Sequence, residues 1–183
     1  MGTFKSVNVL PMAVPKQPKR AATPEEFKAM AHPLRLRILR LCLHDALTNK
    51  ELAERLHKDP ATVLHHVRML VDTGFLAPDR VRSGARGALE KPYRATGKSW
   101  ILSPETPEQV MVGTAAVLDA LKAELLELPA DHVLEDARVG VKISAAKAKR
   151  YQARIEKLVK DFAAEPDDPK GEKFGFYVMW HRR

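Results

Sequence analysis

The side chains best suited to bind a ligand lie along one face of a predicted helix at residues 59–74. With Val63, Val67 and Leu70 turned toward a core, a rotation of about 100° per residue carries small and polar side chains to the opposite face. This outward set comprises Ala61, His65, Arg68 and Asp72, with Thr62 and Leu64 at its flanks. Small side chains allow close approach to a duplex groove, and an arginine such as Arg68 can donate two parallel hydrogen bonds to guanine or to a phosphate. The face therefore predicts contact with the edges of DNA bases.

A second group of cations lies on a predicted β-hairpin. The runs 75–81 and 89–96 have the composition of strands, and the loop between them contains two glycines, which permit a turn. The basic residues of this hairpin are Arg80, Arg82, Arg86, Lys91 and Arg94. Because Arg82 and Arg86 flank the turn, they are the best candidates to bind phosphates or to enter a minor groove.

Capping signals define the two helices that would position these groups. Thr48-Asn49-Lys50-Glu51 is a capping box, in which two side chains each accept a hydrogen bond from the other residue's backbone amide. Asp59 followed by Pro60 opens the next helix after a short turn, and Gly74 ends it. Two capped helices followed by a basic hairpin form the pattern of a winged helix-turn-helix domain. Further candidate DNA contacts at the two helix starts are Thr48, Lys50, Pro60 and Leu64.

Four stretches of the sequence resemble the arsenic-repressor (ArsR) family of bacterial and archaeal winged-helix regulators. They are MAHPLRLRILRLCL, KELAERL, DPATVLHHVRMLVDTGFL and GALEKPYRAT, and the resemblance covers about residues 24–98. It implies a homodimeric transcriptional regulator that binds a palindromic operator in double-stranded DNA, often as a repressor. The chain beyond Ser103 resembles the longer helix-strand-helix-strand extension of one subgroup.

The best-known metal site of that family is absent from this sequence. Alignment on residues 51–53 puts Thr48 and Lys50 where the family has a Cys-x-Cys pair, and neither residue can supply a thiolate ligand. Cys42 and His44 point apart on a helix, as do the adjacent His65 and His66. We therefore expect no metal and no cofactor. The sequence also has no glycine-rich phosphate loop and no catalytic triad spacing, so we expect that the protein is not an enzyme.

Composition agrees with a polyanionic partner. The 183 residues carry a formal charge of +8, and the surplus lies in the first hundred residues, with 18 basic and 9 acidic side chains against 13 and 14 in the remainder. No apolar run approaches the length of a membrane span, so no membrane contact is expected. A single cysteine excludes an intrachain disulfide and suits a reducing compartment, which favours a cytoplasmic protein.

A long helix at 105–128 supplies a wide apolar stripe. We predict that it packs with the helix at 34–43 across a twofold axis, which would place two recognition helices about 34 Å apart. The residues assigned to this dimer interface are Leu36, Leu39, Val110, Met111, Thr114, Val117, Leu118, Leu121 and Leu125. The stripe would also suit the core of its own domain, and both roles can hold at once.

The rest of the chain predicts a strand at 137–143, a helix that begins after Ser144, and an apolar strand at 174–180. This part would extend the dimer, or enclose a small apolar effector. The whole chain is expected to be α+β and mostly helical. Its parts are a flexible basic arm (1–22), a winged helix-turn-helix domain (23–102) and a dimerisation helix with a C-terminal α/β extension (103–183). The alternatives to a DNA-binding regulator are a small-molecule or metal sensor and a winged helix that binds another protein.

Overall fold

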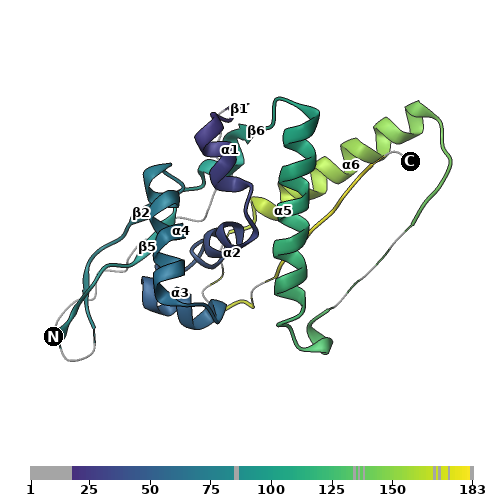
Figure 1. Ribbon diagram of the computed structural model, residues 1–183. Helices are drawn as coiled ribbons and strands as arrows, with labels where there is room; N and C mark the ends of the chain where they lie inside the picture. Colours follow the sequence, from purple (N-terminus) through teal and green to yellow (C-terminus); the bar gives the residue numbers. More distant parts are fainter. Residues whose placement is uncertain are drawn as a thin grey trace. The chain divides into compact units, whose positions relative to one another are not determined.

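The computed structural model describes residues 18–84, 87–133, 135, 137, 139–166, 168, 170–172 and 174–181. The chain divides into a compact unit, Gln17–Glu135, and a second unit that includes Asp136–Arg183. Helices predominate and the sheets are small (Figure 1), which confirms the α+β, mostly helical class. No described helix has the length and the apolar character needed to cross a membrane.

Four short helices begin the first unit, and each starts at a residue whose side chain caps it. They are α1 (Pro24–Met30), α2 (Pro33–Leu41), α3 (Asn49–Leu56) and α4 (Pro60–Asp72). The predicted capping box of Thr48 and Glu51 opens α3, and Asp59 caps α4. Caps of this kind satisfy backbone amides that have no partner inside the helix.

The predicted hairpin is present as two short ladders. Strand β2 (Leu76–Pro78) pairs antiparallel with β5 (Tyr93–Ala95), and β3 (Arg82–Ser83) pairs antiparallel with β4 (Leu89–Glu90). A proline cannot donate a ladder hydrogen bond, and Pro78 ends β2. The hairpin is therefore shorter and less continuous than the predicted runs. We call the segment 79–92 the wing.

The core of this unit lies between α2, α3, α4 and β2. Its largest fully buried side chains include Ile38, Leu52, Leu70 and Phe75. Cys42 is also fully buried, and burial raises the pKa of its thiol to about 12, so it remains a neutral packing residue.

The described residues 20–22, just before α1, are tied to the domain. Arg20 and Ala21, which the sequence assigned to a flexible arm, form β1 and pair in parallel with β6 (Leu102–Ser103). The guanidinium of Arg20 donates to both carboxylate oxygens of the buried Glu26, and the Lys98 ammonium of η2 (Lys98–Ile101) lies 2.6 Å from the same carboxylate. Arg20 and, after it, Lys98 hold the pKa of Glu26 far below its usual range. The arm predicted for 1–17 lies outside the described residues.

The long helix α5 (Pro107–Leu125) packs against α2 and α1 of its own chain. Its buried residues are Ala116 and Ala120, and Arg40 of α2 pairs with Glu124 at 3.0 Å. The predicted contact between this helix and the helix at 34–43 thus occurs within one chain. Leu39, assigned to the dimer interface, is buried in the domain core, so that assignment was wrong.

The second unit contains the helix α6 (Ala145–Ala163), which Ser144 caps as predicted. The strands predicted at 137–143 and 174–180 are absent from the described residues of those segments. A strand exists only when a neighbour accepts and donates its backbone hydrogen bonds, and no described residue of this unit does so for either segment.

Candidate nucleic-acid interface

Helix α4 has the orientation that its sequence predicts. Val63, Val67 and Leu70 are buried. The exposed residues are Ala61, Thr62, His65, Arg68 and Asp72, as expected from their spacing. The two further candidate DNA contacts on this helix differ in exposure. Pro60 is exposed and Leu64 is partly buried. The first three turns therefore present a small and polar surface to solvent.

Hydrogen bonds fix the start of this surface relative to α3. One carboxylate oxygen of Asp59 accepts from the backbone amides of Ala61, at 2.9 Å, and Thr62, at 3.1 Å. The Asn49 amide, in the first turn of α3, donates to the carbonyl oxygen of Pro60 at 2.9 Å. The start of α4 is thus held both by its own cap and by α3, and the first turns of α3 and α4 lie side by side. Lys50 stands exposed beside them.

Thr48 does not belong to the exposed surface. It is buried, and its hydroxyl accepts from the Glu51 amide and donates to the Glu51 carboxylate. Its assignment as a DNA contact is corrected to a structural role, because the side chain is buried and its only donor hydrogen is used within the protein.

A buried arginine, which the sequence reasoning missed, supports α4 from behind. Arg35 of α2 donates to the carbonyl oxygens of Ala29, at 2.6 Å, and Lys28, at 2.5 Å, which end α1. Another guanidinium nitrogen lies 3.4 Å from Nδ1 of His66 on α4. The signal was available, since Arg35 precedes the core residue Ile38 by three positions and so shares its face.

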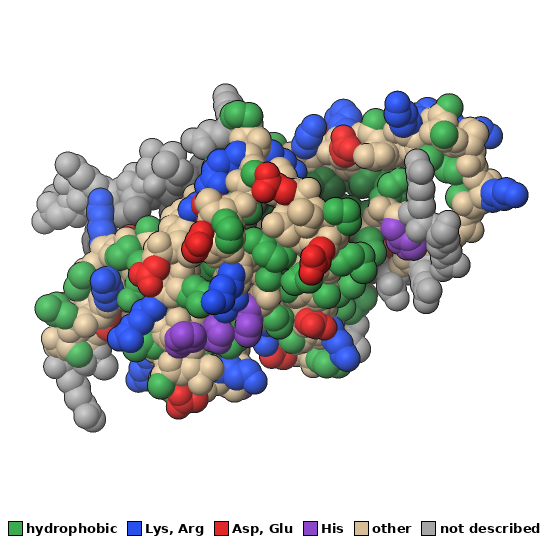
Figure 2. Space-filling view, turned by 45° about the horizontal axis from the view of Figure 1, so that its top comes forward, with side chains coloured by type: hydrophobic (Ala, Val, Ile, Leu, Met, Phe, Trp, Pro, Cys, Tyr) green, Lys and Arg blue, Asp and Glu red, His purple; other side chains and the backbone are tan. Residues whose placement is uncertain are grey.

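Two histidines lie in this support. The rings of His32 and His66 are 4.6 Å apart, and Nδ1 of His32 accepts from the Leu34 amide at the start of α2. Burial, together with the positive charge of its neighbours His32 and Arg35, lowers the pKa of His66 to about 4. His66 is therefore neutral at pH 7. Figure 2 shows histidine side chains next to one another on this face, with lysine and arginine side chains around them.

The cations of the hairpin fall into two groups, those paired with acceptor groups of the protein and those exposed to solvent. Arg82 pairs with Glu90 at 3.0 Å and with Glu51 of α3 at 2.5 Å. Arg94 of β5, just after the wing, is held by Asp79 and by the carbonyl oxygen of His44, both at 2.9 Å. The exposed cations Arg80 and Lys91 lie on the wing. Arg86 falls outside the described residues.

The Arg82 pairs change the interpretation of this residue. Its side chain is 44% exposed, but two carboxylates already neutralise its charge. Although burial alone would raise the pKa of Glu51, hydrogen bonds from Thr48 and Arg82 keep it lowered, so Glu51 is ionised at neutral pH. The sequence predicted a cation at the turn and did not predict its partners.

The central segment of the chain matches a known protein family. Residues 30–79, which contain α2, α3, α4 and β2, match the family described as "Helix-turn-helix domain". None of the curated proteins compared by sequence matches the chain.

Several solved structures are similar at low identity. An ArsR-like transcriptional regulator from Rhodococcus sp. RHA1 is 19% identical, with 75% of this chain and 89% of that chain covered and a TM-score of 0.35. The adhesin competence repressor AdcR from Streptococcus pyogenes is 16% identical, with 74% and 79% covered and a TM-score of 0.31. A complex of MepR from S. aureus with DNA is 15% identical, with 75% and 84% covered and a TM-score of 0.29.

Replacing His66 with glutamine is expected to flatten the acid side of the stability curve. The folded-state pKa of His66, about 4, lies below its ordinary value of 6.5, so the native state binds this proton less readily than the unfolded chain. The resulting stabilisation is complete above about pH 6.5 and is lost as the pH falls toward 4, with a slope of at most about 1.4 kcal/mol per pH unit. Denaturant titrations between pH 7.5 and 4.5 measure this loss.

The control is His132→Gln, which removes an exposed histidine and should leave the curve unchanged. Burial also lowers the pKa of His32, so the His66→Gln variant should still lose part of its stability as the pH falls. An equal decline in the wild type and in His66→Gln would contradict the assignment.

Proposed function

We propose that this chain, which matches a helix-turn-helix family over residues 30–79, is a transcription regulator of the ArsR type that binds a palindromic operator in double-stranded DNA as a homodimer and represses the genes beside it. The observation that carries this proposal is the exposed polar face of α4, held at its start by Asp59 and Asn49. A recognition helix reads bases with residues near its N-terminus, and this end of α4 is capped by Asp59 and tied to α3 by Asn49.

Helix α4 would lie in the major groove. Ala61 and Thr62 in its first turn are small enough for close approach, and His65 and Arg68 follow on the same face. Arg68 suits guanine or a phosphate, and His65 can donate to or accept from a base edge. Asp72 would repel the phosphate chain, so the contacts should concentrate in the first turns.

Phosphate contacts would come from both sides of α4. Lys50 at the start of α3 and the wing residues Arg80 and Lys91 are exposed cations. Arg82 can join them only by exchanging its carboxylate partners for a phosphate. Such contacts carry little sequence information, but they orient the protein and make binding depend on salt.

The dimer would form through a face of α5 that its own domain leaves open. Most of the predicted stripe is exposed, with Met111 70% and Leu118 41% accessible. At about 100° per residue, the centre of this stripe lies about 140° around the helix from Ala116 and Ala120, which face α2. The helix thus has two separate apolar faces, and only one of them is used within the chain.

The proposal is tested by selecting duplexes from a random pool. We expect an inverted repeat whose half-sites are about one turn of B-DNA apart. Arg68→Ala and His65→Ala should change the preferred half-site, by about 1–3 kcal/mol where the side chain contacts a base. Arg55→Ala, which removes an exposed arginine at the far end of α3, serves as the control and should leave the preference unchanged.

Two results would overturn this proposal. One is a selection that yields no enriched sequence. The other is duplex binding that does not weaken with salt, since phosphate contacts must release counterions.

Glu90→Gln should strengthen binding to every duplex, because it removes one of the two charges that compete with phosphate for Arg82. We expect about a threefold gain at low salt, which shrinks as screening increases. Fluorescence anisotropy with operator and random duplexes measures it. Glu105→Gln changes the net charge equally at the start of α5 and is the control. Weaker binding by Glu90→Gln would show that Glu90 instead positions the wing.

Met111→Glu or Leu118→Glu should weaken dimerisation about tenfold or more, because each buries a charge in the apolar stripe. Light scattering measures the mass. Ala115→Glu is the matched control, since Ala115 is exposed on the same helix about 100° from both the centre of the stripe and Ala116. A dimer affinity that both stripe substitutions leave unchanged would contradict an interface on this face.

A further inference from the structure

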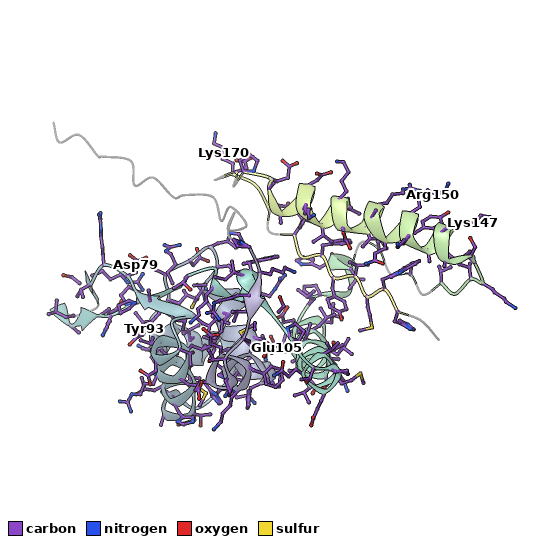
Figure 3. All side chains as sticks on the ribbon, turned by 90° about the horizontal axis from the view of Figure 1, so that it is seen from above. Asp79, Tyr93, Glu105, Lys147, Arg150 and Lys170 are labelled. Atoms are coloured by element: carbon purple, nitrogen blue, oxygen red, sulfur yellow. The ribbon has the colours of Figure 1, made fainter. Side chains whose placement is uncertain are left out.

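The second unit has an apolar face without a core beneath it. No residue of α6 is buried, although its spacing places Tyr151, Ile155, Leu158 and Phe162 on one side. One ring contact is made on this side, between Phe162 and Phe176 at 5.9 Å. Figures 1 and 3 show the segment 174–180 running beside α6.

The segment 174–180, Phe-Gly-Phe-Tyr-Val-Met-Trp, consists of large apolar residues and one glycine. Its large side chains remain between 39% and 60% exposed. Among the described residues, none forms a backbone hydrogen bond with this segment. A sequence that is apolar on both faces is typical of a strand inside a sheet, with neighbours to pair with and layers to cover it.

The exposed apolar area of this unit is large enough for a stable interface. With about 150–250 Å² for each large apolar residue, the exposed fractions of α6 and 174–180 sum to about 800 Å². Monomeric proteins rarely expose more than about 300–600 Å² in one patch. A standard interface buries about 800 Å² on each partner.

We propose that a second copy of this chain covers this face, with the segments 174–180 of the two copies paired antiparallel across the twofold axis. The unpaired backbone decides between occupants. A lipid surface or a small apolar ligand could cover the side chains, but neither can accept and donate the backbone hydrogen bonds of a strand. Another strand can, and closed twofold symmetry requires that a segment pairing with its own copy run antiparallel.

The polar side of α6 would stay in solvent. Arg150, labelled in Figure 3, is exposed outside the apolar face of this helix, as are Lys149 and Lys160. The inference rests on the homodimer of the proposed function, but it concerns the second unit and uses none of the α5 stripe.

A cysteine scan of the full chain tests the pairing. Single substitutions Phe174→Cys, Phe176→Cys, Tyr177→Cys and Met179→Cys are oxidised mildly and the linked dimer is quantified. Antiparallel pairing about a twofold axis brings only the central position next to its own copy, so the yield should peak at one residue and fall on both sides. Cys42 does not interfere, because it is buried with a raised pKa. Lys149→Cys on the polar side of α6 is the control and should not link.

Hydrogen exchange of the wild-type chain supplies a second measurement. Amides of 174–180 should be protected at high protein concentration and lose at least tenfold of that protection on dilution below the dimer dissociation constant. Equal links at all positions, no links, protection independent of concentration, or protection gained only with lipid vesicles would each overturn the proposal.

The tests of the α5 interface, of the 174–180 pairing and of the proposed function have separate outcomes. If Met111→Glu leaves the cysteine link of the second unit intact while the α5 contact is lost, the inference stands and the α5 interface is tested alone. If the link forms but the random-pool selection enriches no sequence, the proposed function fails and the pairing of 174–180 remains.

Discussion

The rotation of α4 about its own axis is the constraint on which the interface depends. Burial of Val63, Val67 and Leu70 sets it, and each of these side chains gains about 1.5–3 kcal/mol from leaving water. Rotating α4 by one residue position would expose that set and bury Arg68. Arg35 and His66 add a polar contact behind the helix, and this contact holds only while His66 is neutral. The polar face of α4 therefore consists of the residues that this core packing leaves exposed.

Glu51 links this packing to the wing. One of its carboxylate oxygens completes the cap of α3, and the other accepts from Arg82. The same anion thus stabilises the helix next to α4 and sets the position of a wing cation. A phosphate that draws Arg82 away would leave the cap intact, because the two contacts use different oxygens. The wing can exchange partners without unfolding the helix beside it.

Local signals in the sequence were sufficient for much of the domain. Thr48, Asp59 and the spacing of Val63 predicted helix starts and the outward face of α4, since these depend on neighbours in the chain. The partners of Arg82 and the burial of Leu39 depend on contacts between distant segments, which periodicity does not contain. For the segment 174–180, the local sequence predicted an element that the described part of the chain does not form. Its composition predicts a strand, yet a strand needs a neighbour that the described part of one chain does not supply.

The two open faces of this chain bear on how tightly the proposed dimer would hold. The stripe on α5 and the face of the second unit are exposed separately, and each would bury apolar area against the same partner. Once one face has joined two copies, the other meets its partner at an effective concentration near the millimolar range. Interfaces that are weak singly would then give a dimer that persists at low protein concentration. A palindromic operator has two half-sites and so binds two α4 helices at once. A dimer that has already formed would present both helices without the free-energy cost of bringing two monomers together on the DNA.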